Sequence, residues 1–153
     1  MARMDESRQG GAEESRPLRV LLVEDDPDIA EVTQYVLESA GMQVTTSSEG
    51  REALARLEVL RPDVIVTDLM MPVLDGLEML RRYRERPGPH APVLAVSAST
   101  VLLERATAGG AAGVLAKPYR VEQLVRRVRH LAARASGRAA RRRTSSVYPR
   151  GER

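Results

Sequence analysis

Five short apolar runs, rich in valine, leucine and isoleucine, alternate along the chain with segments of helical periodicity. The runs cover residues 19–23, 43–46, 63–67, 92–96 and 113–116, and the second is the weakest. Short apolar runs of this kind are typical of strands that are buried on both faces. Because a helical segment separates each pair of runs, we predict an α/β fold, in which a five-stranded parallel sheet carries helices on both faces.

Right-handed crossovers between successive strands make such a sheet doubly wound. We predict the flavodoxin-like strand order 2-1-3-4-5, in which ligands bind at the carboxyl ends of the strands. Asp26 and Pro27 have the residue types of a helix N-cap and a first helical residue, and Gly41 that of a helix end. Ser48 is predicted to open the second helix, and the strongly periodic last helix is predicted to end near Arg134.

Both ends of the chain differ in composition from the part between them. Residues 1–17 are polar and lack periodicity, so we predict a disordered N-terminal tail. Residues 135–153, mainly Ala, Arg, Ser and Gly, are predicted to form a disordered, Arg-rich C-terminal tail, which leaves one folded domain over 18–134. The seven Arg and one Glu of residues 134–153 give +6, against +3 for the whole chain. The net positive charge of the chain therefore comes from its C-terminal end.

The amino-acid composition of the chain excludes several classes of function. The chain has no Cys, which excludes disulfides and Cys-ligated zinc. Its only aromatic residues are four Tyr, too few for a row of base-stacking side chains. The sequence contains no secretory apolar region and no apolar run of membrane-spanning length. We therefore expect a cytoplasmic protein without a membrane partner.

Polar side chains stand at the ends of four of the five predicted strands. Glu24 and Asp25 follow the first strand, and Asp68, Ser97 and Lys117 follow the third, fourth and fifth. Because ligands bind at this edge of the sheet, we expect these side chains to form one site. Three carboxylates close together repel one another unless a cation joins them, and all-oxygen ligation suits Mg²⁺. Such a set suits phosphoryl transfer, with an aspartate oxygen as the nucleophile.

The cationic residue at the end of the fifth predicted strand is a lysine, in a chain that otherwise uses arginine. Of the 24 cationic residues 23 are Arg, and Lys117 is the only Lys. A compact ammonium charge suits a phosphate-sized target. Each site residue taken singly also has an ordinary interpretation, as a helix cap, a loop acid, a backbone-bonded hydroxyl or a solvated cation. A helix cap is the role we prefer for Asp26, whereas the other residues are better explained together.

The motifs around these residues resemble those of the receiver domain of two-component response regulators, over about residues 19–134. Residues 21–27 (LLVEDDP) resemble the first strand and acidic pair of that family. Residues 68–76 (DLMMPVLDG) resemble its phosphoacceptor loop, D-x-x-M-P-x-x-D-G, in a highly specific match. Ser97-Ala98 resembles the hydroxyl step of the family, and residues 117–119 (KPY) resemble its Lys-Pro-aromatic step.

The resemblance implies that Asp68 accepts a phosphoryl group from a sensor histidine kinase or a histidine phosphotransfer protein. Mg²⁺ (or Mn²⁺) would be held by Asp25, Asp68, the backbone carbonyl of Met70 and, directly or through water, Glu24. Ser97 and Lys117 would contact the bound phosphoryl group.

Such a chain is a phosphoacceptor signalling protein rather than an enzyme, although it assists its own phosphotransfer and autodephosphorylation. The Arg-rich end is too short to fold as a DNA-binding output domain. We therefore expect a stand-alone receiver, with output through contact with a downstream protein or through phosphorelay.

Two positions depart from the family pattern or refine it. The family usually has Tyr or Phe three positions before the Lys, and this ring turns inward on phosphorylation; here the residue is Val114, so ring rotation cannot be the switch. Met70 lies two positions after Asp68, where the family tunes hydrolysis. Because an apolar side chain cannot orient water, we predict a long-lived phosphorylated form.

Three other functions compete with phosphoacceptance. The chain could be a constitutive binding module that is never phosphorylated. Residues 138–143 could bind nucleic acid weakly through salt-dependent phosphate contacts, and we expect no other nucleic-acid binding. A flavin or dinucleotide enzyme is disfavoured, since the loop after the first strand is acidic, where a phosphate cradle needs glycine and backbone N–H groups.

Overall fold

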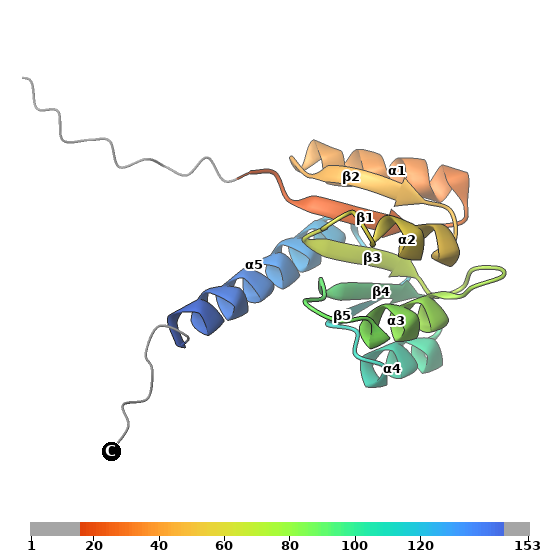
Figure 1. The fold of residues 1–153 in the computed structure, drawn as a ribbon. Helices are drawn as coiled ribbons and strands as arrows, with labels where there is room; N and C mark the ends of the chain where they lie inside the picture. Colours follow the sequence, from red (N-terminus) through yellow and green to blue (C-terminus); the bar gives the residue numbers. More distant parts are fainter. Residues whose placement is uncertain (1–15, 146–153) are drawn as a thin grey trace, which may run out of the picture.

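The computed structural model describes residues 16–145, and its five parallel strands form one sheet of order β2-β1-β3-β4-β5. Figure 1 shows the sheet between two layers of helices, which confirms the predicted α/β fold and strand order. The strands are β1 (Arg19–Val23), β2 (Gln43–Ser47), β3 (Val64–Asp68), β4 (Val93–Ser97) and β5 (Gly113–Ala116). The helices are α1 (Pro27–Ser39), α2 (Gly50–Arg56), α3 (Gly76–Glu85), α4 (Thr100–Ala108) and α5 (Val121–Ser145).

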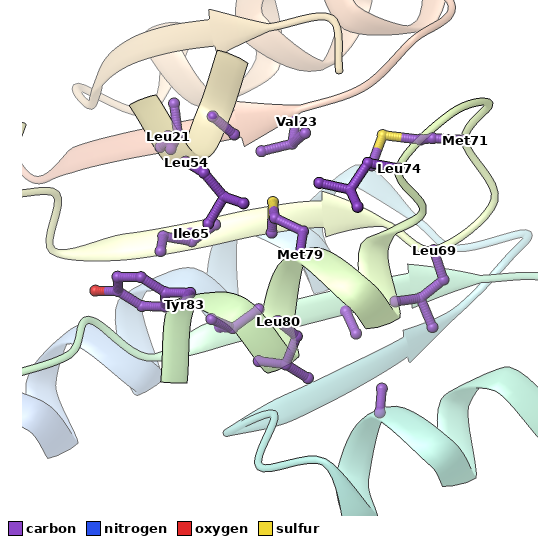
Figure 2. Packing of buried hydrophobic residues seen from close by; sticks show 14 of the residues in the cluster. Leu21, Val23, Leu54, Ile65, Leu69, Met71, Leu74, Met79, Leu80 and Tyr83 are labelled. Carbon is purple, nitrogen blue, oxygen red and sulfur yellow. The ribbon is translucent and has the colours of Figure 1, made fainter. Parts of the chain in front are cut away.

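Each face of the sheet has its own hydrophobic core, because successive side chains of a strand point to opposite faces. Leu21 and Val23 of β1 belong to the cluster that α2, α3 and α4 cover, part of which Figure 2 shows. Val20 and Leu22 belong to the cluster under α1 and α5. Burial on both faces explains why the strands are unbroken apolar runs in the sequence.

Side-chain caps begin three of the helices near the carboxyl ends of the strands. The Asp26 carboxylate accepts hydrogen bonds from the backbone N–H groups of Asp28 at 2.9 Å and Ile29 at 3.2 Å, which confirms Asp26 as the cap of α1. Asp75 caps α3 and Ser99 caps α4 in the same way. These caps fix the helices whose first turns surround the predicted site.

The predicted start of the second helix at Ser48 is wrong by two residues. Helix α2 begins at Gly50, and its N-cap residue Glu49 makes no side-chain capping bond. Ser48 lies ahead of the helix, where its hydroxyl and backbone N–H contact the Glu52 carboxylate at 3.3 and 3.4 Å. The serine thus helps to begin the helix without being its cap.

The prediction of disorder from residue 135 onward is wrong for residues 135–145, because α5 continues to Ser145. Ala and Arg are strong helix formers, and a helix that is already anchored extends at little cost. The predicted N-terminal tail is also wrong for Arg16, whose guanidinium bonds both Asp63 carboxylate oxygens at 2.9 and 3.0 Å. The rest of the predicted tails, residues 1–15 and 146–153, lies outside the described residues. Within 16–145, no helix combines the length and hydropathy that crossing a bilayer requires.

Acidic site at the carboxyl edge of the sheet

Four adjacent strands bring the predicted site residues to one edge of the sheet. Asp68 and Ser97 are the last residues of β3 and β4, and Glu24 and Lys117 directly follow β1 and β5. Because β1, β3, β4 and β5 are neighbours and parallel, their carboxyl ends lie side by side. Residues almost 100 positions apart in the chain therefore meet without any long loop.

Three carboxylates meet at this edge. One oxygen each from Glu24, Asp25 and Asp68 lies within 4.8 Å of the others. The pKa of Glu24 is raised to about 7, mainly by burial and also by the charge of Asp68, while the backbone N–H of Asp26, 3.2 Å from Glu24 Oε1, opposes part of the rise. Burial is thus the main reason why the Glu24 carboxyl group resists ionisation, and the neighbouring negative charge adds to it.

A single ammonium group opposes these carboxylates. Lys117 Nζ lies 3.0 Å from Asp68 Oδ2, and the Asp68 side chain is only 11% exposed. Burial by itself lowers the pKa of Lys117, but the hydrogen bond and the charge of Asp68 outweigh it, so the pKa is raised. The single positive charge of Lys117 does not balance the charges of three ionised carboxylates, so a cation could bind among them. The donor set, all oxygen and partly buried, fits a hard divalent cation such as Mg²⁺.

The loop after Asp68 is held in place by alternate side chains. Leu69, Met71 and Leu74 are buried, and Figure 2 shows them with the core cluster of Leu21 and Ile65. Between them, the Met70 side chain is 63% exposed. The Met70 backbone N–H donates to Asp68 Oδ1 at 3.0 Å, so both oxygens of Asp68 have partners.

Gly76 allows the start of α3 to pack directly against this loop. A Cβ atom at Gly76 would overlap the carbonyl oxygen of Asp68 and would lie 2.9 Å from Leu69 Cα. Both are backbone contacts, which no side-chain rotation can relieve. The sequence identified the D-G step of the motif but not this reason for its glycine, which appears only when the loop and the helix are placed together.

Ser97 is brought to the same edge but contacts another partner. Its side chain is buried, and its hydroxyl accepts a hydrogen bond from the backbone N–H of Ser99, the α4 cap, at 3.1 Å. The backbone of Ser97 is tied to the Lys117 step through a bond from the Lys117 N–H to the Ser97 carbonyl at 2.9 Å. The residue thus connects the site to the beginning of α4.

An exposed apolar surface on α1 lies beside the site. Ile29 and Val32 are spaced as residues on one face of a helix, and their side chains are 42% and 62% exposed. With Tyr119 and Leu124 they line a groove of about 350 Å³ between α1 and the start of α5. Helical period alone indicates which face is apolar but not what covers it.

Val114 stands where the family pattern predicts an aromatic ring. It is partly buried and packs against the cluster under α2, α3 and α4. Its backbone carbonyl accepts a hydrogen bond from Nη2 of Arg127 in α5 at 3.0 Å. At this position the domain therefore has a packed valine side chain and a hydrogen bond from an arginine, and no aromatic ring.

Residues 20–129 match the response regulator receiver domain family, and the chain belongs to this family. The transcriptional regulatory protein TrcR of Mycobacterium tuberculosis is 39% identical over 122 residues, which cover 78% of this chain and 47% of TrcR. The response regulator MprA of Mycolicibacterium vanbaalenii is 38% identical over 122 residues, which cover 78% of this chain and 52% of MprA. The chain thus spans about half the length of these curated relatives.

Solved structures of receiver domains have the same fold. The receiver domain of the Francisella response regulator 1452 has a TM-score of 0.72 and 34% identity, over 77% of this chain and 98% of that chain. The receiver domain of the sensor histidine kinase PA1611 from Pseudomonas aeruginosa has a TM-score of 0.71 and 32% identity, over 76% and 98%. That structure has a magnesium ion coordinated in its active site cleft. Receiver domains serve two-component signalling and take phosphoryl groups from histidine kinases, and phosphorylation and Mg²⁺ binding are typical of the family.

Proposed function

We propose that this receiver domain accepts a phosphoryl group on Asp68 from a phosphohistidine of a histidine kinase or histidine phosphotransfer protein. The observation that carries the proposal is the position of the Asp68 carboxylate, 3.0 Å from the only Lys of the chain and within 4.8 Å of two other carboxylates. The phosphoryl group stays on the chain as a signal, so the protein acts as a phosphoacceptor and not as an enzyme with turnover.

The partners of Asp68 support its role as the nucleophile. Met70 N–H and Lys117 Nζ each hold one of its oxygens, which fixes the direction of the carboxylate. An Asp68 oxygen forms a bond to phosphorus while the phosphorus–nitrogen bond of the phosphohistidine breaks, and the electron pair of that bond returns to the imidazole. Lys117 then pairs with the new phosphoryl oxygens, whose charge it partly neutralises.

The acidic cluster is the proposed site for Mg²⁺ (or Mn²⁺). Asp25, Asp68 and the backbone carbonyl of Met70 would be ligands, with Glu24 bound directly or through water. A bound divalent cation supplies neutralisation of the carboxylates and of the transferring phosphoryl oxygens. Burial and the charge of Asp68 together raise the pKa of Glu24 to about 7, and a bound cation would offset the second of these effects.

The apolar surface of α1 suits the binding of the phosphodonor. The helix begins two residues after Asp25, and Tyr119 of the adjacent groove follows Lys117 by two residues. A partner that covers Ile29 and Val32 would therefore stand beside the carboxylates and could present a histidine to Asp68. Exposed apolar surface of this kind marks interaction sites.

A pair of matched variants tests the donor surface. Val32→Asp on α1 should slow phosphotransfer from a phosphohistidine protein by about tenfold or more, because it puts a charge into an apolar contact. Val101→Asp on α4, also exposed, should leave that rate unchanged. Neither variant should alter phosphorylation by acetyl phosphate, a donor too small to need the surface. Equal rates for all three proteins with the protein donor would remove the proposed surface.

The proposal as a whole is tested by transfer from a ³²P-labelled phosphohistidine protein. Label should move to the wild-type chain in Mg²⁺ but not in EDTA, and Asp68→Asn should accept none. A folded Asp68→Asn protein that still accepts label would show that another residue is the acceptor. A wild-type chain that accepts none from several donors, or from acetyl phosphate, would favour the constitutive binding module.

Signalling from the site is proposed to run through Ser97. On phosphorylation its hydroxyl would leave the Ser99 N–H and bond the phosphoryl group, which would pull the start of α4 inward. Val114 rules out an accompanying turn of an aromatic ring. Amide chemical shifts should then change in 97–102 on phosphorylation. Changes that stay confined to the acidic site would contradict this route to a downstream protein target.

A further inference from the structure

The loop after Asp68 contains two adjacent methionines with opposite environments. Met70 is 63% exposed, whereas Met71 is 8% exposed and packs in the core. Three of the four methionines between residues 16 and 145 are buried: Met42, Met71 and Met79. Figure 2 shows Met71 and Met79 among the side chains of the core. Within this part of the chain, Met70 is therefore the one methionine whose sulfur-bearing side chain is open to solvent.

Methionine supplies all the sulfur of this chain, because the sequence contains no Cys. Peroxide oxidises an accessible thioether to a sulfoxide, and methionine sulfoxide reductases reverse the change. In this step the sulfur takes one oxygen atom from hydrogen peroxide and loses two electrons, and the peroxide is reduced to water. Because burial protects the core methionines, mild oxidation within residues 16–145 should fall on Met70. Met1 and Met4 lie outside the described residues.

The exposed methionine lies beside the proposed phosphoacceptor. The Met70 backbone N–H donates to Asp68 Oδ1 at 3.0 Å, so the Met70 side chain begins next to the carboxylate. Lys117 Nζ holds the other oxygen, Oδ2, also at 3.0 Å. The side chains of Asp68 and Lys117 are only 11% and 28% exposed, so Met70 is the most solvent-accessible of the three. A change in the polarity of Met70 would therefore alter the side of the carboxylate that is nearest to solvent.

We propose that Met70 is an oxidation site, and that its sulfoxide shortens the lifetime of a phosphoryl group on Asp68. The inference rests on the proposed phosphorylation of Asp68. A thioether is a weak hydrogen-bond acceptor, so the reduced Met70 side chain holds no water for attack on phosphorus. Oxidation makes the same side chain polar and gives it an oxygen atom that accepts hydrogen bonds. An oxidant thus converts a water-repelling neighbour of Asp68 into a water-binding one.

Hydrolysis of the phosphorylated chain then proceeds with a positioned water molecule. The water donates a hydrogen bond to the sulfoxide oxygen and is held near phosphorus, as water-positioning residues do in phosphoryl transfer. Its oxygen bonds to phosphorus while the bond between phosphorus and the Asp68 oxygen breaks. The electron pair of that bond returns to the carboxylate, and a proton of the water passes to the released inorganic phosphate. The sulfoxide is unchanged, so its effect lasts until a reductase removes the oxygen.

Contact with a partner is another use for an exposed methionine, because its flexible side chain adapts to many surfaces. The bond between the Met70 N–H and Asp68 favours a role within the site, since it places the side chain at the reacting group. Acetyl phosphate separates the two roles. This donor brings no protein surface with it, so a change in lifetime after loading with acetyl phosphate arises within the chain itself.

The test compares the full chain before and after treatment with dilute hydrogen peroxide. Peptide mass mapping should find a gain of about 16 Da on Met70 before any of the three core methionines gains it. Both forms are then loaded with acetyl phosphate and Mg²⁺, the donor is removed, and loss of the phosphoryl group is followed by intact-protein mass spectrometry. The oxidised form should lose it about threefold to tenfold faster. Treatment with methionine sulfoxide reductases should restore the original lifetime.

Two variants assign the effect to one sulfur atom. Met70→Leu keeps an apolar side chain without an oxidisable sulfur, so its lifetime should be the same with and without peroxide. Met71→Leu removes the adjacent buried sulfur at nearly constant volume and should respond to peroxide as the wild type does. Both variants retain Met1 and Met4, so an effect of either would appear in Met70→Leu. Circular dichroism before and after oxidation checks that each protein is folded.

Three results would overturn the proposal. They are oxidation of the core methionines before Met70, an unchanged lifetime after complete conversion of Met70, and equal shortening in Met70→Leu and the wild type. Failure of the phosphoacceptor proposal gives a different result, because the untreated wild-type chain would then take up no phosphoryl group on Asp68. In that case the lifetime effect falls as well, whereas preferential oxidation of Met70 is measured without any phosphorylation.

Discussion

The acidic site and the second half of α5 stand at opposite ends of one domain and are built in opposite ways. The site combines Glu24, Asp68 and Lys117, which the sheet collects from distant parts of the chain and partly buries. The second half of α5 consists of consecutive turns of a single helix, exposed from Ser136 to Arg143. Burial disfavours the ionised form of Glu24 and raises its pKa to about 7, whereas solvent screens the charges of the exposed helix. Substitutions should therefore have large effects at the site and small effects on stability in the second half of α5.

Two glycine-to-alanine variants test this difference in stability most strongly. Gly76→Ala should destabilise the domain by about 3 kcal/mol, because the added Cβ meets the backbone of Asp68 and Leu69. Gly137→Ala, in the second half of α5, meets nothing within 4 Å and should stabilise by at most about 1 kcal/mol. Urea unfolding measures both. Similar free energies of unfolding for the two variants would contradict the account of the loop.

Substitution of single carboxylates should show whether Mg²⁺ affinity depends on a particular ligand or only on the net charge near the site. Asp25→Asn should lower the affinity for Mg²⁺ by about a hundredfold, since the site loses a direct ligand. Asp28→Asn removes the same charge from the first turn of α1, outside the acidic cluster, and should change the affinity by less than about threefold. Isothermal titration calorimetry measures both, and equal losses would place the metal elsewhere.

The pKa of Glu24 predicts opposite effects of pH on stability and on metal binding. The pKa is about 7 in the folded chain against an ordinary value of 4.5, so stability from protonated Glu24 is complete below 4.5 and is lost as pH rises through about 7.

In EDTA, therefore, the free energy of unfolding of Glu24→Gln relative to that of the wild type should increase by about 1–2 kcal/mol as the pH rises from about 5 to about 8. Mg²⁺ binding to the wild type should strengthen over the same range, because the ion requires the ionised group. A constant difference in unfolding free energy between the two proteins would show that Glu24 does not titrate there.

The smallest predicted effect concerns the lifetime of the phosphorylated form. Met70 is exposed beside Asp68, and its apolar side chain cannot orient a water molecule for attack on phosphorus. Met70→Asn should shorten the lifetime by about threefold to tenfold, which corresponds to about 1 kcal/mol in the barrier. Val73→Asn, exposed in the same loop, is the control and should leave the lifetime unchanged. A lifetime that Met70→Asn does not change would remove this role for Met70.

The acidic site was open to prediction because two simple regularities act together. Apolar runs identify parallel strands, and the carboxyl ends of parallel strands meet at one edge, so the residues after each run must be neighbours. This reasoning predicts from the sequence alone that Glu24, Asp68, Ser97 and Lys117 are neighbours. It does not predict the hydrogen bond of Ser97 to Ser99, since that bond depends on the exact turn that begins α4.

The length of α5 and the surface of α1 were not open to prediction in this way. Composition predicts a tail for the Ala- and Arg-rich segment after residue 134, whereas the intrinsic helix preference of both residue types favours the continuation that α5 shows. Ile29 and Val32 have the helical spacing of an apolar face, but they remain 42% and 62% exposed. Periodicity is local, whereas coverage depends on the whole packed domain.

The central claim is that Asp68 is phosphorylated in a reaction that requires a divalent cation. The most direct measurement is intact-protein mass spectrometry after incubation with acetyl phosphate and Mg²⁺, followed by peptide mapping. We expect an added mass of about 80 Da that maps to Asp68 and is absent in EDTA and in Asp68→Asn. No adduct on the folded wild-type chain, or an adduct that persists in Asp68→Asn, would contradict the account.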